Sequence, residues 1–102
     1  MGKMKYIADV DDLELNMPFK AKYHELPIVI YKTTTGIYAL HDQCSHERFP
    51  LSESAADNDS VECQLHGSTF ALNTGKPYIL PAVEPVKTFP VTVIEGKVYI
   101  DD

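Results

Sequence analysis

Both cysteines of this chain have a histidine close behind them. One residue separates Cys44 from His46, two residues separate Cys63 from His66, and sixteen residues lie between the two pairs. Thiolate sulfur and imidazole nitrogen are ligands of zinc and of iron–sulfur clusters, and such short spacings let one loop present both ligands to one site. With only four histidines in 102 residues, chance is a weak explanation for a histidine at each offset. The spacing therefore predicts a metal centre.

The spacing does not by itself decide which metal is bound. Two thiolates and two imidazoles can form a structural Cys₂His₂ zinc site, and they can also hold a [2Fe–2S] cluster with mixed ligands. A disulfide between Cys44 and Cys63 is a third alternative. The residues 1–5 lead into no apolar signal segment, so we expect a cytoplasmic protein whose thiols stay reduced and available as ligands.

The residues around the two pairs resemble the Rieske family. The motif of that family is C-x-H, about sixteen residues, and then C-x-x-H-G-S-x-F or a close variant; this chain reads C-S-H from position 44 and C-Q-L-H-G-S-T-F from position 63. Further along, 73–77, 80–82 and 84–86 resemble the turn and the proline loop of bacterial Rieske-type ferredoxins. The resemblance covers essentially the whole chain and is closest to the ferredoxin components of multicomponent aromatic-ring dioxygenases.

The resemblance implies one Rieske-type [2Fe–2S] cluster and a ligand for each iron from each loop. In this family the two cysteines bind one iron and the two histidines bind the other. This pattern assigns Cys44 and Cys63 to the first iron, and it assigns His46 and His66 to the second.

The resemblance also implies an all-β Rieske fold. An antiparallel β-sandwich-like base would carry an inserted cluster-binding subdomain, made of two ligand loops and a proline loop. The chain would then be a single Rieske domain, 1–102. Its base would comprise 1–41 and 86–102, and its cluster-binding subdomain would comprise about 42–85.

The residue pattern agrees with this division. Apolar and polar residues alternate from 17 to 24, which is typical of a strand with one buried face. An apolar strand is predicted at 28–32, and Glu95-Gly96 predicts a hairpin near the end of the chain. The segment 41–85 breaks the alternation and is rich in Ser, Asp, Asn, Gly and Pro. We therefore expect an insertion that the metal organises.

Two departures from the high-potential respiratory and photosynthetic members bear on the reduction potential. Those relatives have an extra cysteine in each ligand loop, and a disulfide joins the two extra cysteines. Phe49 and Leu65 stand at these positions here, so this disulfide cannot form. They also have a tyrosine that donates to a ligand cysteine, and Phe70 stands at that position. Ser68 keeps a hydroxyl for a bridging sulfide, and Gly67 serves a tight turn. We expect a potential in the lower part of the Rieske range of roughly −150 to +300 mV.

The ligand region also has the features of a docking surface. In this family the histidine-bound iron lies at the tip of the protein, which makes His46 and His66 the expected exit for the electron. Apolar residues would form a collar that covers the cluster and offers a partner a surface to bury. The collar residues are Phe49, Leu65, Leu80, Pro81 and Ala82. Shielding of the cluster from water is an alternative role for the same residues.

The charge of the chain is concentrated in the same region. Its net charge is −6, and the segment 42–66 has six carboxylates against the single base Arg48, a local balance of −5. This predicts an acidic docking face with Glu47, Glu53 and Glu62, although a solvated acidic loop would look the same. The acidic balance argues against nucleic acid as a partner.

The function that the resemblance implies is electron transfer. The chain would carry one electron at a time from an NAD(P)H-dependent flavoprotein reductase to a terminal Rieske non-haem iron oxygenase, and both partners would bind transiently. It would be no enzyme itself, because two histidines beyond the cluster leave no facial triad for a mononuclear iron. The alternatives are a Rieske-like small subunit of an assimilatory nitrite reductase and a zinc-stabilised interaction domain. We expect a monomer without a membrane-spanning segment.

Overall fold

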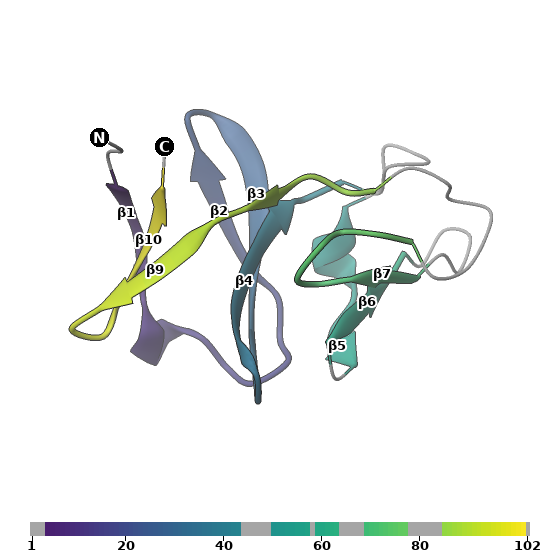
Figure 1. The fold of residues 1–102 in the computed structure, drawn as a ribbon, viewed down its shortest axis with the longest axis horizontal. Coiled ribbons are helices and arrows are strands. Elements are labelled where there is room, and N and C mark those ends of the chain that lie inside the picture. The colour runs from purple at the N-terminus through teal and green to yellow at the C-terminus, as the bar shows by residue number, and fades with distance from the viewer. Residues whose placement is uncertain (1–3, 44–49, 58, 64–68, 78–84, 102) are drawn as a thin grey trace.

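The computed structural model describes residues 4–43, 50–57, 59–63, 69–77 and 85–101. These residues form three antiparallel sheets and two short 3₁₀ turns, which confirms the all-β prediction. Figure 1 shows the three sheets following one another along the long axis of the molecule. No helix among the described residues is long and apolar enough to cross a membrane.

The outer sheet joins the two ends of the chain. It consists of β1 (Met4–Asp9), β10 (Lys97–Asp101) and β9 (Val91–Ile94), in that order. The predicted hairpin joins β9 to β10, and both turn residues, Glu95 and Gly96, have positive φ values of 50° and 75°. This backbone twist matches the right-handed twist of the paired strands, which is why a turn with glycine is preferred here. The 3₁₀ turn η1 (Val10–Asp12) follows β1.

The central sheet is built around one strand that is buried on both faces. Its order is β2-β3-β4-β8, and its strands are β2 (Phe19–Tyr23), β3 (Leu26–Thr33), β4 (Gly36–His41) and β8 (Thr88–Phe89). Four consecutive residues of β3, from Ile28 to Tyr31, are 0% exposed. Alternate residues of a strand point to opposite faces, so this strand must be covered on both sides.

Two hydrophobic cores cover the two faces of the central sheet. The first core lies between the central and outer sheets and contains Leu13, Ile28, Ile30, Ala39, Phe89, Val98 and Ile100. The second core lies on the opposite face and contains Val29, Tyr31, Leu40, Leu51, Ala56, Val61, Cys63, Phe70, Leu72 and Val86. The period of two along β3 therefore divides its side chains between the cores. Each fully buried large side chain contributes about 1.5–3 kcal/mol.

A third, inserted sheet completes the second core. It consists of β5 (Ala56–Asp57), β6 (Ser60–Glu62) and β7 (Thr69–Ala71), and the 3₁₀ turn η2 (Leu51–Glu53) precedes it. All three strands lie within the segment 41–85, for which the sequence predicted an insertion but no individual strand. They were missed because two or three residues are too few to show an alternating pattern. The predicted boundaries between base and subdomain remain a prediction.

Gly75 fixes the turn that follows β7. Its amide donates a 2.7 Å hydrogen bond to the carbonyl oxygen of Ala71, and its carbonyl oxygen accepts a 2.8 Å bond from the amide of Val86. Its φ is 76°, and a Cβ at this position would overlap the carbonyl oxygen of Val86. Glycine is thus required both by the backbone conformation and by the close approach of Val86. This contact joins the two ends of the stretch 76–85.

We expect Gly75→Ala to lower the free energy of unfolding by more than Gly96→Ala. The two glycines have φ values of 76° and 75°, at which alanine costs about 1–2 kcal/mol. Only the alanine at position 75 would also collide with a neighbouring backbone, because nothing lies within 4 Å of a Cβ at position 96. Urea unfolding of both variants measures the difference. Equal losses would show that the contact with Val86 is unimportant.

Candidate metal centre

Cys63 is the one predicted ligand that lies among the described residues. The other three predicted ligands, Cys44, His46 and His66, fall outside them. So do several further site residues predicted from the sequence, namely Glu47, Phe49, Leu65, Gly67, Ser68, Leu80, Pro81 and Ala82. The predictions for these residues therefore stay predictions, and the site is built here from the residues that border them.

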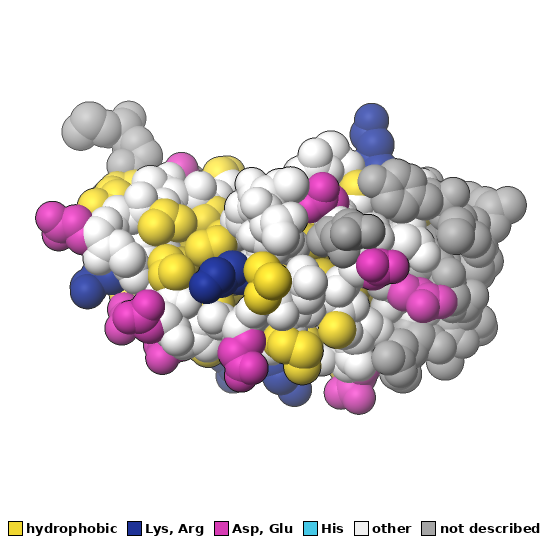
Figure 2. All heavy atoms as spheres, turned by 90° about the horizontal axis from the view of Figure 1, so that it is seen from below, with side chains coloured by type: hydrophobic (Ala, Val, Ile, Leu, Met, Phe, Trp, Pro, Cys, Tyr) yellow, Lys and Arg dark blue, Asp and Glu magenta, His cyan; other side chains and the backbone are white. Residues whose placement is uncertain are grey.

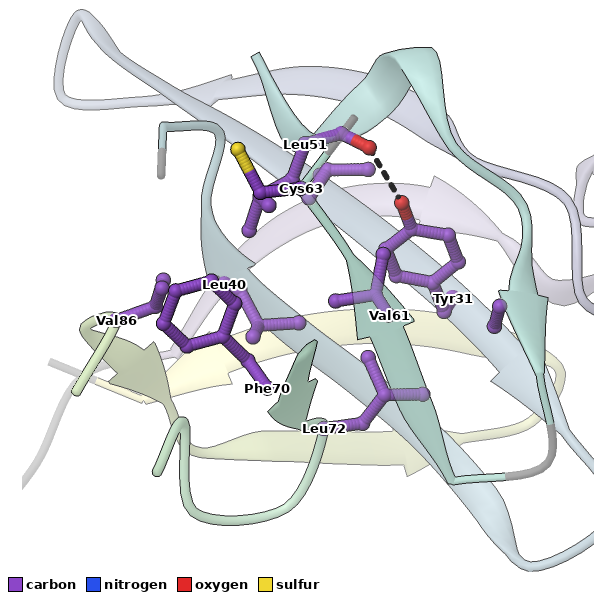
Figure 3. Packing of buried hydrophobic residues seen from close by; sticks show 10 residues of the cluster. Tyr31, Leu40, Leu51, Val61, Cys63, Phe70, Leu72 and Val86 are labelled. Carbon is purple, nitrogen blue, oxygen red and sulfur yellow. Dashed lines mark hydrogen bonds between the residues drawn. The ribbon is translucent and has the colours of Figure 1, made fainter. Parts of the chain in front are cut away.

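Cys63 follows directly after β6 and faces the second core. The alternation of the strand places Glu62 on the outside, where it is exposed, and Cys63 on the inside, where it is 0% exposed. Figure 3 shows its sulfur pointing away from the ring of Phe70. A thiolate in apolar surroundings needs a compensating positive charge, and a bound metal supplies one. The environment of Cys63 therefore fits a metal ligand.

Four residues close to the undescribed stretches 44–49, 64–68 and 78–84 lie in the second core. Leu51 lies two positions after 44–49, Cys63 directly precedes 64–68, Phe70 lies two positions after 64–68, and Val86 lies two positions after 78–84. All four residues belong to the second core, and none is more than 3% exposed. These stretches carry the two predicted ligand loops and the proline loop. One close-packed core therefore holds these four residues in fixed relative positions.

The carboxylate of Asp42 joins the two described ends of the stretch that contains Cys44 and His46, because it binds Ser52 on the far side of that stretch. Its Oδ1 accepts a 2.7 Å hydrogen bond from the amide of Ser52, and its Oδ2 accepts a 2.7 Å bond from the Ser52 hydroxyl. The amide of Asp42 donates a 3.0 Å bond to the carbonyl oxygen of Pro27, which extends the pairing of β4 with β3. Ser52 is thereby anchored to the central sheet.

Tyr31 holds the same 3₁₀ turn from the other side. Its hydroxyl lies 2.9 Å from the carbonyl oxygen of Leu51 and 2.6 Å from that of Ser54, and it can donate to either. Burial, and after it the negative charge of Asp42, raise the pKa of Tyr31 well above its ordinary value. The hydroxyl thus stays a neutral donor throughout the physiological pH range. Figure 3 shows its bond to Leu51 within the second core.

Sequence reasoning missed Tyr31, Asp42 and Ser52. The signals were weak: a tyrosine inside an apolar strand, and an aspartate two positions before a cysteine. Tyr31 and Asp42 form hydrogen bonds with partners at least ten positions away along the chain. A pattern in the sequence does not show such pairs.

The described residues of the predicted acidic face lie on the outside of the same region. Glu53 ends η2 and Glu62 ends β6, and both are exposed. Glu62 also lines a groove of about 190 Å³ together with Asp57, Ser60 and Thr69. The inserted sheet thus presents a buried thiol on its inner face and carboxylates on its outer face.

The chain matches the model of a known family. A family model described as the Rieske [2Fe–2S] domain matches residues 3–90. The chain belongs to this family. The match includes both cysteine–histidine pairs, and it gives this Rieske domain one [2Fe–2S] cluster as its cofactor. The predictions of the family and of the cofactor are thereby confirmed.

Individual relatives and solved structures are similar to this chain over almost its whole length. The 3-phenylpropionate/cinnamic acid dioxygenase ferredoxin subunit of Photorhabdus laumondii subsp. laumondii is 38% identical over 96 residues, which are 93% of this Rieske domain and 90% of the relative. A Sphingomonas yanoikuyae B1 ferredoxin has a TM-score of 0.91 and 25% identity, with 98% of this chain and 99% of that chain covered. This likeness confirms the predicted Rieske fold.

A further solved structure contains an oxygenase as well. In the complex of reduced oxygenase and oxidized ferredoxin in carbazole 1,9a-dioxygenase, the matching chain has a TM-score of 0.87 and 31% identity. The match covers 95% of this chain and 91% of that chain.

We expect Tyr31→Phe to destabilise the Rieske domain by about 1–3 kcal/mol, because the substitution removes the buried hydroxyl that donates to the carbonyl oxygen of Leu51 or of Ser54. Tyr38→Phe is the matched control, since the Tyr38 hydroxyl lies 2.8 Å from Thr35 Oγ1 in an exposed position. Denaturant unfolding of the two variants measures the losses. If Tyr38→Phe lowers the free energy of unfolding by as much as Tyr31→Phe does, the buried hydrogen bonds of Tyr31 do not stabilise η2.

Proposed function

We propose that Cys44, His46, Cys63 and His66 hold the [2Fe–2S] cluster, with the two cysteines on one iron and the two histidines on the other. The motif around both pairs and the family match support this ligand set. So does the buried position of Cys63, in one core with Leu51, Phe70 and Val86.

The bound cluster takes up and releases one electron. The oxidised core carries about two positive charges, so two thiolate ligands leave the site near neutral, whereas four would leave it anionic and harder to reduce. The chain adds a protein environment to this chemistry. Cys63, Phe70 and Val86 provide apolar surroundings on one side, from which water is excluded, and such surroundings tune a potential together with hydrogen bonds to sulfur.

We propose that the protein is the ferredoxin component of an aromatic-ring dioxygenase system. It would accept an electron from an NAD(P)H-dependent flavoprotein reductase and deliver it to a terminal Rieske oxygenase, as a monomer with transient partners. The observation that carries this proposal is the match over almost the full length of a dioxygenase ferredoxin subunit. The carbazole dioxygenase ferredoxin in complex with its oxygenase supports the second half of the transfer.

The direct test is reconstitution. The purified protein should contain two irons and two acid-labile sulfides, and it should restore substrate turnover when it is added to a flavoprotein reductase and a terminal oxygenase of this class. A protein that contains zinc in place of iron, or that leaves turnover at the background rate with every such pair, would refute the proposal.

We further propose that the potential lies in the lower part of the Rieske range. Phe70 is fully buried in the second core and has no hydroxyl to donate to a ligand cysteine. The prediction is that Phe70→Tyr raises the midpoint potential, because a donor to a ligand sulfur stabilises the reduced state. Phe89→Tyr, in the first core, is the control. Redox titration decides: an unchanged or lower potential in a folded Phe70→Tyr variant would count against this account.

The acidic docking face is likewise a proposal, with Glu47, Glu53 and Glu62 as its residues. Figure 2 shows acidic side chains scattered over the described part of one face of the molecule. The base of the chain, however, also contains most of the lysines, so the net charge is concentrated in the segment 42–66. Charge complementarity of this kind speeds association with a basic partner.

Glu53→Gln and Glu62→Gln should each slow electron delivery to the oxygenase at low ionic strength and flatten its salt dependence. Glu25→Gln is the control, because Glu25 is exposed in the turn between β2 and β3. Stopped-flow rates across a salt series measure the effect. Rates that respond neither to salt nor to these substitutions would refute electrostatic docking.

A further inference from the structure

We propose that Asp42 has two roles at the metal centre: its carboxylate holds the first ligand segment closed through Ser52, and its shielded negative charge lowers the reduction potential of the cluster. This inference rests on the proposed ligand set, in which Cys44 and His46 follow Asp42 at two and four positions. Asp42 is a positioning residue and contacts no reacting atom.

The closing role follows from the two partners that Asp42 has on different elements. Its backbone is tied to β3 through the 3.0 Å bond to Pro27, and both carboxylate oxygens are used by Ser52 at 2.7 Å. Nine residues, among them both predicted ligands of the first loop, lie between Asp42 and Ser52. Hydrogen bonds to a charged acceptor are about twice as strong as neutral ones, so this pair holds the two ends of the segment at a fixed separation.

The tuning role follows from burial and proximity. Asp42 is 8% exposed, so water screens its charge poorly. Two peptide units separate it from Cys44, and consecutive Cα atoms are about 3.8 Å apart, so the two Cα atoms lie within about 7.6 Å of each other. A negative charge this near to a ligand cysteine along the chain would favour the oxidised cluster over the reduced one and so lower the reduction potential.

The two bases that line a groove with Asp42 are both exposed. They are Lys20 and Lys22, and water therefore screens their charges. The pKa of Tyr31 is raised first by burial and then by the negative charge of Asp42.

Three substitutions separate the two roles. Asp42→Asn removes the charge but can keep both contacts, because the amide oxygen accepts from the Ser52 amide while the amide nitrogen donates to the Ser52 hydroxyl oxygen. Ser52→Ala keeps the charge and removes one hydrogen bond. Asp42→Ala removes the charge and the hydrogen bonds to Ser52. Asp101→Asn is the matched control, because Asp101 also accepts from a hydroxyl, that of Thr92 at 3.2 Å, but does so in the outer sheet.

The experiment measures the midpoint potential and the rate of iron loss to a chelator for each holoprotein. Asp42→Asn should shift the potential to more positive values than Asp101→Asn does, with iron retention close to wild type. Ser52→Ala should lose iron about tenfold faster, since it lacks one charge-assisted hydrogen bond, without a positive shift of its potential. Asp42→Ala should show both changes.

Equal potentials for Asp42→Asn and Asp101→Asn would overturn the tuning role, and iron loss from Ser52→Ala at the wild-type rate would overturn the closing role. If Asp42→Asn takes up no cluster, Asp42→Glu becomes the second variant. It keeps the charge, so a potential well above wild type would overturn the tuning role. A wild-type protein without a [2Fe–2S] cluster would refute the proposed function itself, which is a separate outcome.

Discussion

The second core is the constraint on which the rest of the structure depends. A cluster with two ligands from each of two loops requires that the loops keep a fixed separation, and loops have few packing contacts of their own. Here four residues close to the undescribed stretches, Leu51, Cys63, Phe70 and Val86, pack in one buried cluster with side chains of the central sheet. Packing against the central sheet thereby fixes the positions of residues close to the segments that contain the predicted ligands.

The central strand β3 makes this possible because it serves both cores at once. Ile28 and Ile30 pack toward the outer sheet, and Val29 and Tyr31 pack toward the inserted sheet. A strand covered on both faces shows no alternation, which is why its sequence is an unbroken apolar run. The tyrosine in this run keeps a polar atom inside the second core, and that atom is used to hold η2.

Much of the base was predictable from the sequence because its strands are long enough to show their period or their turn residues. The hairpin at Glu95-Gly96 and the all-β class were read correctly in this way. The alternating run from Met17 was read slightly too long, since β2 begins at Phe19 and Met17 is 49% exposed. The inserted sheet was missed, because its strands depend on pairing partners and on the second core more than on local propensity.

The site also has a part that the sequence predicts and a part that it does not. Its cofactor could be predicted, since the ligand types and the residues beside them form a local motif, and the family match confirms it. The supporting residues could not be predicted, because Asp42 finds Ser52 ten positions later and Tyr31 finds Leu51 twenty positions later. Such pairs are set by the tertiary fold. The sequence does contain the residues that this support uses, but it does not show which of them meet.

The most direct test of the account is a measurement of nitrogen coupling to the reduced cluster. Protein labelled with ¹⁵N only in histidine, reduced and studied by pulsed electron paramagnetic resonance, should show two coupled histidine nitrogens. The coupling should persist in His24→Gln and His41→Gln and should be altered in His46→Cys and His66→Cys. A reduced cluster without coupled histidine nitrogen, or coupling that depends on His24 or His41, would contradict the ligand set on which the account is built.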